Sequence, residues 1–178
     1  MDYDLLVRGG RVVDGSGLPS YLADVGIKDG KIAEIGRLKP GAARTIDAGW
    51  LVVAPGFIDH HTHLDAQLLW DPYGTSEPQH GVTSVVMGNC GLTLAPVKKG
   101  EEDALVKSFV RVEAIPRYAL EQGVRWNWHT FGEYLDSLEG KVGINVGGLV
   151  GHIAVRQYVM GEESVERQAT PGEIQQMR

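Results

Sequence analysis

Residues 55–65 have the sequence PGFIDHHTHLD, and no other run constrains the chain as strongly. The run follows a short apolar, β-branched stretch at residues 51–54, which predicts a buried strand. Since successive side chains of a strand point to opposite faces, we expect His61 and His63 on one face and His60 on the other. Two imidazoles on one face at a strand end can bind one metal ion. The alternative is a pair of surface histidines without a metal.

The composition excludes several classes of protein. Hydrophobic residues make up 43% of the chain and charged residues 22%, which is typical of a soluble globular protein. The formal net charge is −6, with acidic and basic residues interspersed, so we expect no nucleic-acid partner and no membrane partner. No run approaches the ~18 apolar residues of a membrane helix, and the acidic N-terminus lacks a signal-peptide pattern. A lone cysteine forms no internal disulfide, so the expected compartment is the cytoplasm.

Residues 1–53 predict a small antiparallel β unit, because short apolar runs alternate quickly with turns. Asp29-Gly30 is a strong hairpin signal within this unit, since glycine tolerates the positive φ that two-residue turns require. The expected strands are residues 5–7, 12–13, 25–27 and 32–35.

Residues 54–178 change to an α/β rhythm in which strands alternate with helices, and this implies crossover connections and a parallel sheet. Pro116 predicts a break or kink in a long helical stretch. Thr130 and Glu133 form a capping-box pattern that predicts the start of another helix. The expected strands are residues 84–87 and 142–150, and the expected helices are residues 101–122 and 130–140.

The last residues predict a further short helix. Thr170, Pro171 and Glu173 have the pattern of an N-cap, a first helical position and a capping acid. The sequence stops at Arg178, and a helix of about two turns has little stability of its own. We therefore expect a truncated piece of a longer protein; the alternative is a short terminal helix that docks on the body. A partial sheet exposes unpaired edges, through which we expect self-association.

Cys90 is the second candidate for the metal site. It follows the predicted strand at residues 84–87, as His61 and His63 follow the preceding one. The C-terminal ends of parallel strands meet at one side of an α/β barrel, so one thiolate and two imidazoles are expected together. This combination suits zinc. The alternative is that Cys90 is a small buried hydrophobic residue.

Several motifs resemble those of the N-acyl-D-amino-acid deacylases (D-aminoacylases) of the amidohydrolase superfamily. Residues 55–63 are similar to the superfamily motif PGFID-x-H-x-H, and residues 81–92, GVTSVVMGNCGL, resemble the deacylase signature GVTTVV-x-GNCG. The similarity extends from about residue 5 to the end of the chain. Further similar blocks are HTHLDAQ at residues 61–67, WDP at 70–72, WNWHTFGEYL at 126–135 and GHIAVRQYVMG at 151–161.

The resemblance implies a β-sandwich beside a metal-dependent (β/α)₈ TIM barrel that hydrolyses small N-acyl-D-amino acids with one zinc ion or two. It implies that His61, His63 and Cys90 are metal ligands, the cysteine taking the place of the carboxylated lysine of hydantoinase-like relatives. It also implies that two further histidine ligands and the general-base acid lie beyond residue 178. No catalytic residue is therefore expected within residues 1–178, and the isolated chain is expected to be inactive.

Three residues have two open interpretations each. Asp59 shares the phase of the histidines and either orients one of them or is a solvated acid at a strand end. Asp65 matches a position of the family motif and either faces the pocket or is a solvated acid. His152 is expected to end the third strand, as a pocket residue or as a core histidine. Two other functions also remain open: a cyclic amide hydrolase of the dihydroorotase or hydantoinase type, and a non-catalytic metal-binding module.

Overall fold

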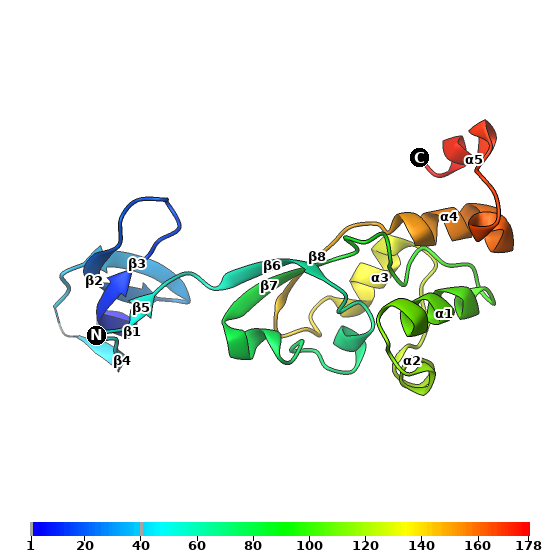
Figure 1. Cartoon of the computed structure of the whole chain (residues 1–178). Helices are drawn as coiled ribbons and strands as arrows, with labels where there is room; N and C mark the ends of the chain where they lie inside the picture. The colour runs from blue at the N-terminus through cyan, green and yellow to red at the C-terminus, as the bar shows by residue number, and fades with distance from the viewer. Residues whose placement is uncertain (1, 40) are drawn as a thin grey trace. The chain divides into compact units, whose positions relative to one another are not determined.

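The computed structural model describes residues 2–39 and 41–178, which form a mixed α/β structure of two compact units (Figure 1). The first unit ends at Pro55 and the second begins at Gly56. Within the described residues, no helix has both the length and the apolar character needed to cross a membrane.

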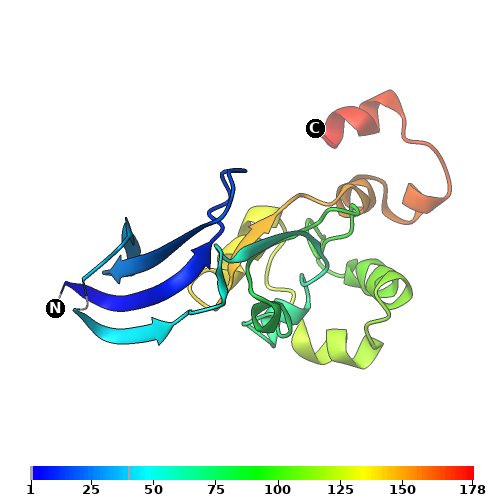
Figure 2. The ribbon, with the colours of Figure 1, turned by 60° about the vertical axis from the view of Figure 1, so that its left-hand side comes forward.

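The first unit is a mixed sheet with the strand order β3-β2-β1-β4, in which β5 also pairs with β1 (Figure 2). The expected antiparallel arrangement holds for β1, β2 and β3, whereas β4 and β5 run parallel to β1. Asp29 and Gly30 form the expected hairpin turn with φ angles of 50° and 72°. The strands are β1 Tyr3–Val12, β2 Tyr21–Lys28, β3 Lys31–Gly36, β4 Ala42–Asp47 and β5 Val52–Val53.

Two predictions in this part of the chain are wrong. Residues 5–7 and Val12 belong to one strand, β1, which continues through Gly9 with a register shift and without a turn, and Val13 lies just beyond its end. The stretch at residues 51–54 is not the buried strand that leads into the histidines. Val52 is 64% exposed and lies in β5, and the histidine run has its own strand, β6, from Phe57 to Thr62. A short apolar run does not indicate with which sheet its residues will pair.

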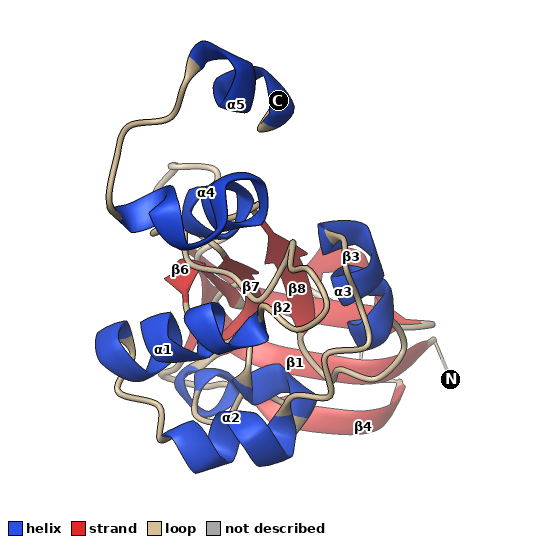
Figure 3. Cartoon of the chain, turned by 90° about the vertical axis from the view of Figure 1, so that its right-hand side faces the viewer, coloured by secondary structure: helices blue, strands red, loops and turns tan. Residues whose placement is uncertain are grey.

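The second unit contains a three-stranded parallel sheet with the order β6-β7-β8, as the strand–helix rhythm predicts. Helices α1, α2 and α3 pack with this sheet around one apolar core (Figure 3). Core residues include Val85 and Met87 of β7, Phe109 of α1 and Tyr134 of α3. The strands are β6 Phe57–Thr62, β7 Val82–Met87 and β8 Asn145–Gly148.

The helices of the second unit follow the sequence signals closely at their N-termini. Pro116 precedes α2 and separates it from α1, so the predicted long helix is two helices. Thr130 and Glu133 form the predicted capping box of α3, and Thr170 and Glu173 form that of α5. Helix α4 was not predicted. The helices are α1 Glu102–Val112, α2 Arg117–Gly123, α3 Phe131–Leu138, α4 His152–Met160 and α5 Pro171–Gln176, with short 3₁₀ helices at Gln67–Leu69, Glu77–His80 and Gly161–Val165.

Candidate metal centre

The C-terminal ends of β6 and β7 lie side by side. Thr62, the last residue of β6, is opposite Met87, the last residue of β7. His63 follows immediately after β6, and Cys90 lies in the turn after β7. Because the two strands are parallel, the two segments lie at the same end of the sheet, as the sequence predicts.

The turn that carries Cys90 depends on glycine. Gly88 has a φ of 86°, and a Cβ atom there would lie 2.1 Å from the carbonyl oxygen of Leu149. Gly91 also has a positive φ, and its amide donates a hydrogen bond to the Gly88 carbonyl oxygen over 3.1 Å. The Asn89 side-chain amide donates to the His60 carbonyl oxygen of β6. These contacts fix the Cys90 turn against the histidine strand.

His61, His63 and Cys90 bring three potential metal ligands together. One ligand atom from each residue lies within 4.8 Å of the other two. Nε2 of His61 is 3.0 Å from Sγ of Cys90, and the His61 and His63 ring centroids are 5.6 Å apart. Cys90 is a free, exposed cysteine, so the interpretation of it as a small buried hydrophobic residue is wrong.

This donor set fits zinc. Zinc binds cysteine sulfur at about 2.3 Å and histidine nitrogen at about 2.0–2.1 Å in tetrahedral geometry, so neighbouring donors lie about 3.5 Å apart. The 3.0 Å between Nε2 of His61 and Sγ of Cys90 is somewhat shorter than this value, and the 4.8 Å limit on all three separations is somewhat longer. Thiolate and imidazole ligands together also favour zinc over magnesium or calcium, which prefer oxygen.

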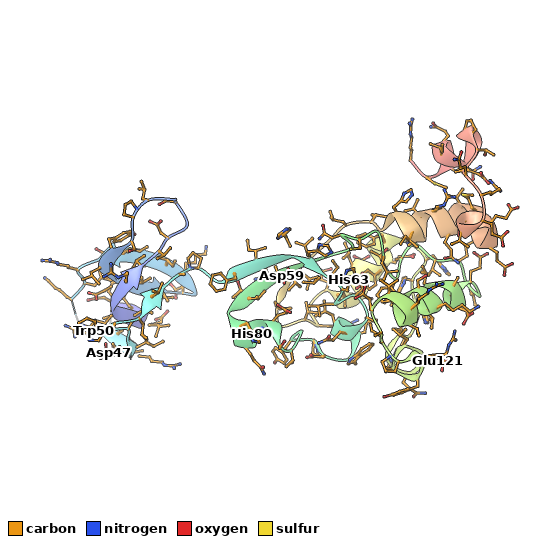
Figure 4. The ribbon with its side chains drawn as sticks, in the orientation of Figure 1. Asp47, Trp50, Asp59, His63, His80 and Glu121 are labelled. Atoms are coloured by element: carbon orange, nitrogen blue, oxygen red, sulfur yellow. The ribbon has the colours of Figure 1, made fainter. Side chains whose placement is uncertain are left out.

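His63, which is labelled in Figure 4, lies next to an acidic side chain as well as within the ligand cluster. Its Nδ1 atom is buried and lies 3.4 Å from Oε1 of Glu113, the residue that follows α1. Sequence reasoning did not find Glu113, because an acid at a helix end carries no signal that distinguishes it from a solvated one.

Asp65 is completely buried, and neither of its carboxylate oxygens has a hydrogen-bond partner within the described residues. Burial raises the pKa of Asp65 to about 7, and the negative charge of Glu113 adds to the rise. The interpretation of Asp65 as a solvated acid is therefore wrong. Its backbone carbonyl oxygen accepts a hydrogen bond from the buried Tyr134 hydroxyl over 2.9 Å, which ties the segment after His63 to α3.

The carboxylate of Asp59 contacts backbone rather than an imidazole. Its Oδ1 atom accepts a hydrogen bond from the backbone amide of His61 over 3.0 Å. Asp59 is partly buried and is labelled on β6 in Figure 4. It therefore shapes the backbone that carries His61.

His152 does not end the third strand, because β8 stops at Gly148 and His152 is the first residue of α4. The next residue, Ile153, donates a backbone hydrogen bond to the Gly91 carbonyl oxygen, so the start of α4 packs against the Cys90 turn. The His152 side chain is exposed, and it lines a hollow of about 650 Å³ together with residues such as Arg156. The interpretation of His152 as a core histidine is wrong.

Comparisons relate this geometry to known proteins. Residues 44–178 match the amidohydrolase family. Over 178 residues the chain is 40% identical to the D-aminoacylase of Alcaligenes xylosoxydans xylosoxydans, an alignment that covers 99% of this chain and 34% of that protein. A solved structure of D-aminoacylase, described as having a binuclear metal center, matches with a TM-score of 0.78 and 38% identity over 98% of this chain and 34% of the other.

A second solved relative is the N-acyl-D-glutamate deacylase of Bordetella bronchiseptica in complex with zinc and a phosphonate inhibitor. It matches with a TM-score of 0.79 and 32% identity, over 99% of this chain and 35% of the other. The chain thus spans about one third of the length of each of these relatives.

Proposed function

Because the chain belongs to the amidohydrolase family, we propose that it carries the first part of the metal centre of an N-acyl-D-amino-acid deacylase. The substrate class is small N-acyl-D-amino acids, and the reaction is hydrolysis of their amide bond. The convergence of His61, His63 and Cys90 is the observation that carries the proposal.

In this proposal the imidazoles of His61 and His63 and the thiolate of Cys90 hold one zinc ion or share in holding two. The chemistry that zinc supplies when bound is Lewis acidity, which polarises an amide carbonyl and lowers the pKa of a water molecule to about 7. The chain's other contributions are positional. Asp59 holds the His61 backbone, and the glycine turn at residues 88–91 holds the Cys90 thiol at the strand end.

The finer fold is part of the same proposal. The mixed sheet at residues 3–53 forms one part of a β-sandwich, and β6, β7 and β8 are the first strands of a (β/α)₈ barrel. The parallel order of these strands and their helical connections support this assignment. Since β6 and β8 each pair on one side only within the described residues, we also propose that their free edges mediate self-association. The free thiol of Cys90 suits the reducing cytoplasm.

The site also needs a carboxylate that takes a proton from water and delivers it to the leaving amine. We assign this role to a residue outside residues 1–178. Asp65 has no exposed surface, and Glu113 faces the buried nitrogen of His63, so neither is placed to reach a substrate. Pure residues 1–178 are therefore expected to hydrolyse no N-acyl-D-amino acid, and EDTA-sensitive turnover by this chain would contradict that part of the proposal.

The position of Cys90 argues against the cyclic amide hydrolases. In hydantoinase-like relatives the family resemblance assigns its place to a carboxylated lysine. Here a thiol lies 3.0 Å from Nε2 of His61, and it provides the anionic ligand without any modification. A non-catalytic metal-binding module would need the same ligands, so only an activity measurement separates it from the deacylase.

A chimera tests the function directly. Residues 1–178 replace the aligned segment of the Alcaligenes D-aminoacylase, to which they are 40% identical. The chimera is expected to hydrolyse N-acyl-D-amino acids with dependence on added zinc, to discriminate against the L-enantiomers, and to lose activity with His61→Ala or Cys90→Ala. Hydrolysis of hydantoins instead, or a folded chimera that binds zinc but cleaves neither substrate class, would overturn the proposed reaction.

A further inference from the structure

His63 has an acidic neighbour that the proposed ligand set does not explain. Its Nδ1 atom is buried, and the nearest charged group is the carboxylate of Glu113 at 3.4 Å. The side chains of both residues are 20% exposed. Asp65 is buried nearby, but it forms no ion pair with His63 among the described residues. Glu113 is therefore the acid that His63 faces.

The backbone around Glu113 is held firmly in place. The Glu113 amide donates a hydrogen bond of 2.9 Å to the carbonyl oxygen of Phe109, whose side chain is completely buried in the core. The next residue, Ala114, has a φ of 54°. A residue with a Cβ adopts this left-handed conformation only where the surrounding structure imposes it, and such positions concentrate at functional sites. The core and the strained residue together direct Glu113 toward His63.

Glu113 does not belong to the ligand cluster itself. The group of side chains whose ligand atoms lie within 4.8 Å of one another contains His61, His63 and Cys90, and no carboxylate from the described residues joins it. This placement is consistent with an action of Glu113 on a metal ion through His63.

We propose that Glu113 is a positioning residue: it accepts a hydrogen bond from Nδ1–H of His63 and so leaves Nε2 with the lone pair that binds the metal. This inference rests on the proposed metal centre. An imidazole that carries its proton on Nδ1 can coordinate only through Nε2, and an acceptor at Nδ1 fixes both the tautomer and the orientation of the ring. At 3.4 Å the contact is longer than a well-formed hydrogen bond, so the proposed bond requires the Glu113 carboxylate and the His63 ring to come slightly closer.

The test uses the 178-residue chain with three substitutions. Glu113→Leu removes the acceptor, Glu113→Gln keeps a neutral acceptor, and Glu101→Leu removes an exposed acid just before the same helix as a matched control. Long-range ¹H–¹⁵N spectra of the metal-free chain at pH 8 report the His63 tautomer. Competition with a chelating dye reports the dissociation constant for zinc, and thermal unfolding confirms that each variant folds.

We expect Nδ1–H at His63 in the wild type, in Glu101→Leu and in Glu113→Gln, and a shift toward Nε2–H in Glu113→Leu. Zinc binding should weaken about 10- to 100-fold in Glu113→Leu, with partial recovery in Glu113→Gln. A merely structural role would change the unfolding temperature without changing the tautomer. The inference is overturned if the tautomer is the same in Glu113→Leu, or if zinc affinity stays within about twofold of wild type.

Failure of the inference and failure of the proposed function give different results. If the wild-type chain binds zinc and the Glu113 variants bind it equally well, Glu113 has no positioning role and the metal centre stands. If the wild-type chain binds no zinc, the proposed metal centre falls. In that case the tautomer spectra still decide whether Glu113 accepts the proton of His63.

Discussion

The two units of the chain are built on very different cores. In the first unit, the buried apolar cluster consists of Val12, Ala23 and Val25, and large side chains such as Leu22 and Trp50 are exposed. In the second unit, one continuous cluster joins the sheet to helices α1, α2, α3 and α4 and includes Phe109, which has no exposed surface. The candidate metal site lies entirely in the second unit.

This difference indicates which unit holds its side chains in fixed positions. A metal site needs side chains that hold their positions, and packed elements hold side chains better than a thin sheet does. His63 and Glu113 are each anchored next to a buried element of the second unit, through the Asp65–Tyr134 hydrogen bond and the core helix α1. We therefore expect the second unit to dominate both the stability and the metal response of the chain.

Truncation of a core residue should show the largest contrast between the units. Phe109→Ala removes a fully buried ring and is expected to destabilise the second unit by about 3–5 kcal/mol. Val25→Ala removes two methyl groups from the small cluster of the first unit and should cost about 1–2 kcal/mol. Hydrogen exchange measured by mass spectrometry reports the two units separately. Equal losses of protection in both variants would contradict the difference in their cores.

Zinc should stabilise one unit only. At a zinc concentration of about 100 times the dissociation constant, the second unit should gain about 2.7 kcal/mol against unfolding while the first unit gains nothing. Cys90→Ala should weaken binding about 100- to 1,000-fold, because one ligand contributes about a quarter of the ~10–16 kcal/mol typical of a four-ligand zinc site. Hydrogen exchange with and without zinc checks both statements. Protection that appears in residues 3–53, or that persists in Cys90→Ala at the same zinc concentration, would count against the proposed site.

Lowering the pH should slightly destabilise the first unit, because the Asp4 carboxylate becomes protonated. The hydrogen bond from Lys28 Nζ, at 2.8 Å, lowers the pKa of Asp4 below its usual 3.8, and the Asp29 amide also donates to this carboxylate. A carboxylate with a lowered pKa adds stability above the unfolded pKa, and this stability is lost as pH falls below about 4. Asp4→Asn should therefore flatten the pH dependence of first-unit unfolding below pH 4, and Asp136→Asn in the second unit is the control. Identical pH profiles for wild type and Asp4→Asn would show that the exposed pair contributes nothing.

Much of the second unit could be predicted because its signals are local. Capping boxes at Thr130 and Thr170 and the proline before α2 mark helix starts through the chemistry of the backbone itself. The parallel order of the strands follows from the helices between them. His61, His63 and Cys90 then come together because the C-terminal ends of parallel strands lie at the same end of the sheet.

The predictions failed where the position of a residue depends on partners that are distant in the sequence. Val52 and Val53 look like a buried strand, but they pair with β1 in the first unit, and local sequence does not show that choice. Glu113 acquires its place only when the end of α1 comes to lie beside His63, which is fifty residues earlier in the sequence. No pattern of spacing distinguishes such an acid from the solvated acids of the same helix.

X-ray absorption at the zinc edge is the most direct test of the claim that two imidazoles and one thiolate share a metal ion. For the zinc-loaded 178-residue chain we predict one sulfur at about 2.3 Å and nitrogen ligands at about 2.0–2.1 Å, with loss of the sulfur in Cys90→Ala. A wild-type spectrum with only nitrogen and oxygen around zinc, or one that is unchanged in Cys90→Ala, would contradict the shared site.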